Sequence, residues 1–252
     1  MLKRFFIVLL LPLLVAGCTP KARLMKIESR NYRLEKSNSD VDSAAYYKIL
    51  PYQKSLTADM GKVLAYSEQS LEKGLPEGLL GNFVADACLL IANRLYIPGD
   101  GQKIDFLFLN NGGLRSSLPK GNITKGNVFE LMPFENELVV LKLNGRVVKN
   151  IFNFIASKEG APVAGLRFTI KDKEAFNIII NNEEFDSTKT YKVATSDYLA
   201  NGGDQFFFLA NVKERESINL KVRDAIMQYL SQKSITQEHI VVKLDQRISH
   251  AK

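Results

Sequence analysis

Three polar loops, each placed after an apolar run, hold the side chains of this sequence that are able to do chemistry. The first loop, 110–115, reads Asn-Asn-Gly-Gly-Leu-Arg. Its glycines let a ligand approach the backbone, an asparagine such as Asn110 offers an amide donor and acceptor, and Arg115 offers a fork suited to phosphate or carboxylate. A tight turn with a surface arginine would have the same composition. The loop alone therefore predicts either anion binding or a purely structural turn.

The second and third loops add aromatic side chains and a carboxylate. In the second, 131–137, Phe134 directly follows a proline, so it is either an anchor packed on the core or an exposed platform for stacking. In the third, 196–206, Tyr198 precedes a Gly-Gly pair and Asp204, whose carboxylate accepts hydrogen bonds of the kind that sugar hydroxyls donate. A glycine turn without a ligand is again the alternative.

These loops must be positioned by a body of mixed helices and strands, because apolar residues recur with both helical and strand periods. The expected helices cover 44–59, 82–95, 124–131, 145–155 and 219–232, with Thr124 as a candidate N-cap. The expected strands cover 61–67, 105–109, 138–143, 165–170, 175–180, 191–195 and 240–244. This mixture predicts one α/β domain over 44–248.

The first residues are typical of an export signal. Two basic residues precede an apolar run over 5–16, which is shorter than the ~20 residues of a spanning helix. Small residues then precede Cys18, as in the lipobox of bacterial lipoproteins. We expect a signal peptide over 1–17, a lipidated Cys18 with a tether over 18–43, and a lipid-anchored protein of the cell envelope, at the outer membrane facing the periplasm. A short strand at 31–34 is possible within the tether. An ordinary signal peptide with an incidental cysteine is the alternative.

Composition excludes several classes of function. The 34 basic residues outnumber the 27 acidic ones, for a net charge of +7, but they are scattered, so we expect no nucleic-acid partner. Two cysteines exclude a disulfide scaffold and a four-cysteine zinc site. The second, Cys88, lies in an apolar helical run and is expected in the core. The two histidines, His239 and His250, make a metal centre with several imidazoles hard to build.

Taken together, the three loops resemble the C-terminal, substrate-binding domain of bacterial and animal 5′-nucleotidases. Residues 76–87, which read PEGLLGNFVADA, are similar to a helix start of the same family. The resemblance runs in the family's order over nearly all of 44–248. It implies a four-layer α-β-β-α domain, which the predicted elements permit.

The resemblance also implies a role for five residues. Phe134 and Tyr198 match the two aromatics that sandwich the nucleobase, each stacking contact contributing about 1–3 kcal/mol. Asp204 matches the carboxylate that binds the ribose hydroxyls, Asn110 the amide near the base, and Arg115 the arginine on the ribose and phosphate side. Tyr198 departs from the family's usual phenylalanine, which preserves stacking and adds a hydroxyl.

Two further departures affect the expected function. The family often carries an arginine just before the Pro-Glu segment, where this sequence offers only Lys73, so a weaker grip on phosphate is expected. The Asp-x-His and Gly-Asn-His motifs of the family's metallophosphatase domain are missing, as are other hydrolase signatures. We therefore expect no cofactor on this chain, with divalent metals only on a partner metallophosphatase.

Three hypotheses follow from this combination. The leading one is the substrate-recognition half of a split 5′-nucleotidase that binds an AMP-like nucleotide or nucleoside in nucleotide catabolism and is inactive alone. The alternative is a non-enzymatic nucleoside- or nucleotide-binding lipoprotein of the periplasm. A structural lipoprotein with an inactive pocket is the third.

Overall fold

The computed structural model describes residues 26–32 and 42–251. The chain divides into two units, residues 1–49 and 50–252. The predicted signal peptide and Cys18 lie outside the described residues and stay predictions.

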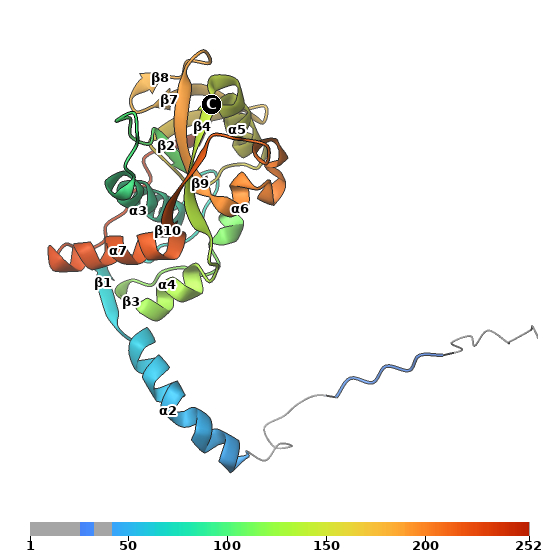
Figure 1. The fold of residues 1–252 in the computed structure, drawn as a ribbon, viewed down its shortest axis with the longest axis vertical. Coiled ribbons are helices and arrows are strands. Elements are labelled where there is room, and N and C mark those ends of the chain that lie inside the picture. Colours follow the sequence, from blue (N-terminus) through green and yellow to red (C-terminus); the bar gives the residue numbers. More distant parts are fainter. Residues whose placement is uncertain (1–25, 33–41, 252) are drawn as a thin grey trace, which may run out of the picture. The chain divides into compact units, whose positions relative to one another are not determined.

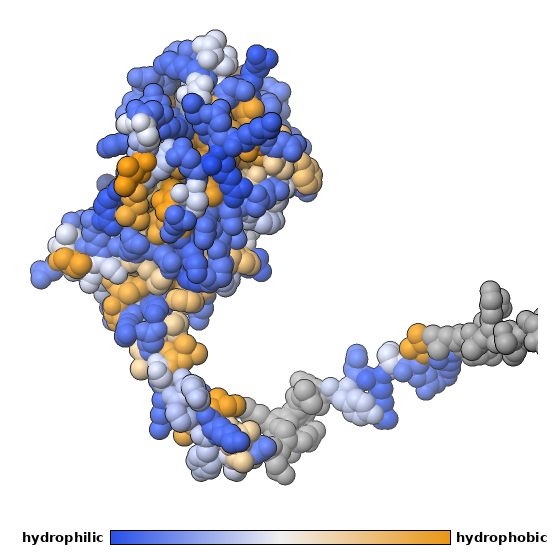
Figure 2. Space-filling view, viewed as in Figure 1, coloured by the Kyte–Doolittle hydropathy of each residue, from blue (hydrophilic) through white to orange (hydrophobic). Residues whose placement is uncertain are grey.

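Among the described residues before position 50, only those from 43 onward are helical. Residues 26–32 contain no helix or strand, so the expected strand over 31–34 is not seen at its first two positions, and the other two lie outside the described residues. Helix α2, Ser43–Met60, confirms the expected helix and buries none of its side chains. Figure 2 shows hydrophobic side chains along it, and Ile49 and Leu56 of this helix are exposed. Within the described ranges, no helix has the length and hydropathy needed to cross a membrane.

Three β-sheets form the frame of residues 50–251. The central sheet has five strands in the order β10-β4-β9-β2-β5, namely Arg215–Lys221, Glu137–Asn144, Thr190–Ser196, Phe106–Phe108 and Val163–Ala164. A four-stranded sheet has the order β11-β6-β7-β8, namely Ile248–His250, Leu166–Lys171, Glu174–Ile180 and Glu183–Glu184. A two-stranded sheet pairs β1, Val63–Ser67, with β3, Gly121–Thr124.

Helices cover the central sheet and create two hydrophobic cores. Helices α3, Leu79–Leu95, and α7, Val222–Ile235, lie side by side and pack with one face of the sheet (Figure 1). The opposite face packs with α5, Gly145–Ser157, and the four-stranded sheet. Strand β4 serves both cores because successive side chains of a strand alternate between its faces. Leu138 and Val140 join the first core, and Val139 and Leu141 join the second.

The expected α/β fold is thus confirmed, together with several local details. Thr124 caps α4, Lys125–Leu131, because its hydroxyl accepts the Asn127 N–H while the Asn127 side chain accepts the Thr124 N–H. Cys88 is fully buried in α3, as expected. Burial raises the pKa of its thiol to about 12, because a thiolate loses its solvation in an apolar core.

Two of the expected elements differ from the structure, one in its bounds and one in kind. The helix expected over 219–232 begins at Val222, because the preceding residues complete the edge strand β10. The strand expected over 240–244 is an extended segment in which Ile240 alone bridges to Ser67. Side-chain amides bond its next carbonyls: Gln69 donates to the Val242 oxygen over 2.6 Å, and Asn82 donates to the Lys243 oxygen over 3.0 Å. The last strand, β11, follows at Ile248–His250.

Candidate functional site

Neighbouring parallel strands carry the first and third loops. Strand β2 pairs in parallel with β9, with Leu107 opposite Ala194. Because parallel strands end at the same edge of a sheet, the loops that follow them emerge together. Asn110 and Tyr198, which are far apart in the sequence, therefore meet at one edge of the central sheet.

The first loop forms a tight turn, and hydrogen bonds hold both the backbone and the side chain of Arg115. Residues Asn111–Gly113 form a single 3₁₀ turn. A Cβ atom at position 113 would lie 3.0 Å from the Asn110 Oδ1 atom, so glycine leaves room for that amide. The Arg115 backbone N–H donates to the Leu131 oxygen over 2.8 Å, and its guanidinium donates to the Gly112 oxygen over 3.3 Å.

The third loop presents Tyr198 and Asp204 to each other. Helix α6, Asp197–Ala200, starts directly after β9 and carries Tyr198 in its first turn. A Cβ atom at position 203 would lie only 2.5 Å from the Tyr198 Cζ atom, so Gly203 makes room for the ring. Asp204 follows with φ at 47°, a left-handed conformation that aspartate tolerates better than most residues.

A hydrogen-bond network joins the two loops. The Asn110 side-chain amide donates to the Asp204 Oδ2 atom over 2.5 Å, and the Tyr198 hydroxyl donates to the Asp204 Oδ1 atom over 2.9 Å. The Asp204 backbone N–H donates in return to the Tyr198 hydroxyl over 3.2 Å. Bonds to an ionised acceptor are the stronger kind, so the network orients the carboxylate and the tyrosine ring together.

The second loop connects α4 to β4 and is held by α7. The carboxylate of Glu135 forms ion pairs with Lys221 and Arg223. The nearly buried Arg223 also donates to the Met132 oxygen over 3.2 Å, and its guanidinium lies 4.2 Å from the centroid of the Phe129 ring. Phe134 lies between the two loop residues that Arg223 contacts. Arg223 therefore holds the loop on both sides of Phe134, although it is not among the residues that line the cavity around Phe134.

The charges around Glu135 shift its titration. Hydrogen bonds from Lys221 and then Arg223 lower the pKa of this carboxyl from 4.5 to about 2, because both cations favour the ionised form. The attachment of the loop to α7 is therefore charged throughout the neutral and weakly acidic range.

Residues of all three loops line one cavity of about 340 Å³, which we call the first cavity. It is lined by Asn110, Gly112, Gly113, Arg115, Phe134, Asn136, Tyr198 and Asp204. All five residues predicted from the sequence are among them. The Phe134 and Tyr198 side chains are 41% and 43% exposed, and within the described part of the chain neither ring pairs with another aromatic ring. The cavity thus offers two free aromatic faces, a carboxylate and a guanidinium.

Asn136 is the one polar side chain of this cavity that the sequence reasoning did not assign. Its signal was its position two residues after Phe134 in the same loop. Its backbone oxygen accepts the Val222 N–H over 2.9 Å, which gives the loop a second attachment to the start of α7.

A family model described as the 5′-nucleotidase C-terminal domain matches residues 56–211. The chain belongs to this family. The matched range contains the whole first cavity, and the domain is the substrate-binding part of 5′-nucleotidases.

Relatives and solved structures agree with the assignment. The chain is 27% identical over 175 residues to a 5′-nucleotidase of Vibrio cholerae, covering 66% of this chain and 30% of the relative. It is 33% identical over 112 residues to protein UshA of Escherichia coli, covering 42% of this chain and 20% of the relative. The chain thus spans about a third or less of the length of these relatives.

The fold is similar to that of a 5′-nucleotidase precursor from Thermus thermophilus, with a TM-score of 0.68 and 26% identity over 84% of this chain and 44% of that chain. An NAD nucleotidase from Haemophilus influenzae gives a TM-score of 0.63 at 17% identity, over 85% of this chain and 42% of that chain, and supports the fold alone.

Lys73, which stands where this family often has an arginine, contacts the first loop. Its ammonium donates to the Leu114 oxygen over 3.1 Å. It does not line the first cavity. Arg115 is therefore the cation that the first cavity presents to an anion.

The family motif over 76–87 attaches a distant segment of the chain. The Glu77 carboxylate accepts the Asn82 side-chain N–H over 2.6 Å and the Asp245 backbone N–H over 2.8 Å. The Arg247 guanidinium bonds both oxygens of Asp86, over 2.8 and 3.0 Å, and both oxygens of Asp245, over 2.9 and 3.0 Å. These motif residues stabilise the fold rather than line the first cavity.

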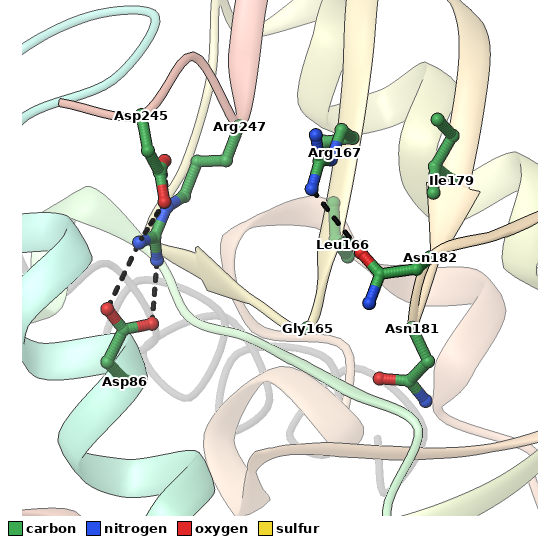
Figure 3. Close-up of a pocket in the computed structure, with 9 residues that line it drawn as sticks. All are labelled: Asp86, Gly165, Leu166, Arg167, Ile179, Asn181, Asn182, Asp245 and Arg247. Atoms are coloured by element: carbon green, nitrogen blue, oxygen red, sulfur yellow. Dashed lines mark hydrogen bonds and ion pairs between the residues drawn. The ribbon is translucent and has the colours of Figure 1, made fainter.

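Figure 3 shows this arginine beside a larger cavity of about 540 Å³. The five N–H donors of Arg247 are engaged by the two carboxylates and by the Val163 oxygen over 2.8 Å. Arg167 points to Asn182 on the opposite wall (Figure 3). None of the predicted site residues lines this cavity, and its buried cation has no donor left for a ligand.

The described residues do not form a site for the family's catalytic metals. In the ranges that the structure describes, no three His, Cys, Asp or Glu side chains gather as a metal site requires. Each histidine pairs with a carboxylate outside the first cavity: His239 contacts Glu68, and His250 Nε2 lies 3.6 Å from a Glu159 oxygen. We therefore derive no chemical step through a metal on these residues.

Proposed function

We propose that this chain binds a nucleoside or nucleotide in the cavity of the three loops, as the substrate-recognition part of a 5′-nucleotidase whose metal chemistry resides on a separate metallophosphatase. The observation that carries the proposal is the convergence of Phe134, Tyr198, Asp204, Asn110 and Arg115 on one cavity. Two exposed rings that pair with no described aromatic ring suit a planar base, and the Asp204 carboxylate suits sugar hydroxyls.

Ligand binding is tested by thermal unfolding of the mature protein with adenosine, AMP, UMP or UDP-glucose. A ligand at 100 times its Kd adds about 2.7 kcal/mol to the free energy of unfolding, which raises the Tm of a domain of this size by about 5–10 °C. Phe134→Ala and Tyr198→Ala should each abolish most of this shift. Phe207→Ala is the matched control, because Phe207 is exposed nearby and does not line the first cavity. No shift with any of the four ligands would refute nucleotide binding.

The separate metallophosphatase is tested by phosphate release from AMP. We expect none from the purified protein with manganese or zinc, and release after addition of a metallophosphatase that co-purifies with it. Phosphate release by the purified protein alone would refute the proposal that a separate metallophosphatase supplies the metal chemistry. Ligand binding without any co-purifying phosphatase would favour the non-enzymatic binding lipoprotein.

The membrane attachment through Cys18 is a further part of the proposal. It rests on the apolar run and small residues before Cys18, and a diacylglycerol on that thiol would supply the two acyl chains that stable anchoring needs. Radiolabelled palmitate should be incorporated by the wild type and not by Cys18→Ser, and the wild type should fractionate with the outer membrane. Equal labelling of both proteins would refute lipidation at this residue.

A further inference from the structure

The hydroxyl of Tyr198 bonds both the backbone and the side chain of Asp204. It donates to the Asp204 Oδ1 atom over 2.9 Å and accepts the Asp204 backbone N–H over 3.2 Å. A tyrosine hydroxyl can donate and accept at once, and here it does both toward a single residue. The two bonds therefore fix the carboxylate relative to the left-handed backbone of Asp204, whose φ is 47°.

The ring of Tyr198 is held at its hydroxyl end. A Cβ atom at position 203 would lie 2.5 Å from the Tyr198 Cζ atom and 2.6 Å from its Cε1 atom, so this end of the ring packs closely against Gly203. The ring cannot swing away from Gly203 without breaking the two bonds to Asp204. Tyr198 and Asp204 both line the first cavity, so the stacking face and the carboxylate keep a fixed relation inside it.

The carboxylate of Asp204 keeps one acceptor site on each oxygen. An ionised carboxylate has about four lone-pair sites, two on each oxygen. Tyr198 uses one site on Oδ1, and the side-chain amide of Asn110 uses one on Oδ2 over 2.5 Å. In the described part of the chain no third hydrogen bond reaches these oxygens. One remaining site on each oxygen matches two donors on neighbouring carbon atoms, such as the 2′- and 3′-hydroxyls of a ribose.

We propose that the Tyr198 hydroxyl is a positioning group, which holds the Asp204 carboxylate so that a base stacked on the Tyr198 ring brings two ribose hydroxyls onto the two remaining acceptor sites. Base stacking and sugar recognition are thereby coupled through one side chain, and the site selects nucleosides that carry both hydroxyls. A phenylalanine, the family's usual residue here, would provide the stacking face without this coupling. The inference rests on the proposed nucleoside binding.

Titration calorimetry with adenosine and 2′,3′-dideoxyadenosine tests the coupling, because the two ligands share a base and differ only in the sugar hydroxyls. The wild type should bind adenosine at least about tenfold more tightly, since hydrogen bonds to a charged acceptor are the stronger kind. Tyr198→Phe should weaken adenosine binding about 3- to 10-fold, because binding must then immobilise the Asp204 side chain. The same variant should keep dideoxyadenosine affinity within about twofold, because the phenyl ring still stacks on the base.

Tyr96→Phe is the matched control. The Tyr96 hydroxyl also donates to a carboxylate, that of Glu216, over 3.0 Å, and Tyr96 does not line the first cavity. The substitution removes the same kind of hydrogen bond at a different place in the domain. It should therefore leave the affinities for both nucleosides as they are in the wild type.

A double-mutant cycle separates positioning from direct contact with the ligand. Asp204→Gly removes the carboxylate and tolerates the left-handed backbone. In that variant, adding Tyr198→Phe should change the adenosine Kd by less than about twofold, because the hydroxyl acts through Asp204. An equally large effect with and without the carboxylate overturns the inference.

Two other results overturn the inference and leave the proposed function standing. One is adenosine binding by Tyr198→Phe that is as tight as that of the wild type or tighter. The other is equal affinity of the wild type for adenosine and dideoxyadenosine. Failure of the wild type to bind either nucleoside overturns both the inference and the proposed function.

Discussion

Replacing Arg223 by methionine should weaken nucleoside binding although Arg223 does not line the cavity. This side chain contacts three parts of the structure around Phe134: the Glu135 carboxylate, the Met132 oxygen and the Phe129 ring. Methionine has a similar length and no charge, so it removes all three interactions and leaves the packing volume nearly filled.

The magnitude follows from these contacts. The bond to Met132 from a charged donor is worth about 1.5–3 kcal/mol, and a desolvated cation–π contact about 2 kcal/mol. Burial of the methionine side chain returns about 1.5–3 kcal/mol. We expect a net loss of about 2 kcal/mol, or about 4–8 °C in Tm. If binding must then order one or two loop residues, at about 1–2 kcal/mol for the first, the Kd for adenosine rises at least 5- to 30-fold.

The assay is calorimetric titration with adenosine, beside thermal unfolding of the free protein. Lys221→Met is the matched control, because Lys221 also pairs with Glu135 but is 40% exposed, and exposed ion pairs contribute little. Lys221→Met should change neither the adenosine affinity nor the Tm much. Equal effects of the two substitutions, or unchanged adenosine affinity in Arg223→Met while Phe134→Ala abolishes binding, would refute the reasoning.

The ion pairs of Glu135 with Lys221 and Arg223 also predict that adenosine affinity does not change with pH in the neutral and weakly acidic range. The pKa of Glu135 falls to about 2 in the folded protein, from 4.5. A lowered carboxyl pKa stabilises the folded state fully above the unfolded value, and this stabilisation is lost as the pH falls from about 4.5 towards 2. Adenosine affinity should therefore show no transition from Glu135 between pH 8 and 5. A transition near pH 6 that Glu135→Gln removes would contradict this.

Three further outcomes are expected. Gly203→Ala should weaken adenosine binding in a titration and lower the Tm, because the new Cβ atom would lie 2.5 Å from the Tyr198 Cζ atom and 2.6 Å from the Tyr198 backbone oxygen; unchanged affinity would show that the ring does not bind. Cys88 should react with a thiol reagent only at the rate of unfolding, because it is buried and its thiol has a pKa of about 12; fast labelling of the native protein would contradict this. Arg247→Met should lower the free energy of unfolding by about 1.5–3 kcal/mol in urea, because it removes the bond from a charged donor to the Val163 oxygen; an unchanged midpoint would show that the contacts of Arg247 are dispensable.

Much of the fold was predictable because its elements carry clear apolar periods. Strand β4 alternates between two cores, and α4 begins at the capping residue Thr124. The edge strand β10 was missed because its residues are mostly polar and exposed, as is common at sheet edges that must avoid pairing. The strand predicted over 240–244 failed for a different reason. Its apolar residues suit a strand, but distant side chains, which no local pattern reveals, bond its backbone.

The five residues could be proposed from the sequence because the order of their loops resembles the family's, whereas the composition of each loop alone also fits a structural turn. The structure adds their attachments. No local signal connects Arg223 to Glu135, or Lys158 to Gln205, since these pairs are 88 and 47 residues apart. The cavity of about 360 Å³ that is lined by Phe154, Lys158 and Gln205 was likewise not predictable, because its walls come from segments that only the folded chain brings together.

The bonds that join Glu77 to Asp245 and Asp86 to Arg247 also constrain the order in which this domain can fold during its synthesis. The ribosome adds Arg247 161 residues after Asp86, and Asp245 168 residues after Glu77. Until then Glu77, just before α3, and Asp86, within it, have neither the backbone N–H nor the arginine that they bond in the folded domain. Helix α3 is therefore synthesised early, but its contacts with residues 245 and 247 can form only after the last residues of the domain have been added.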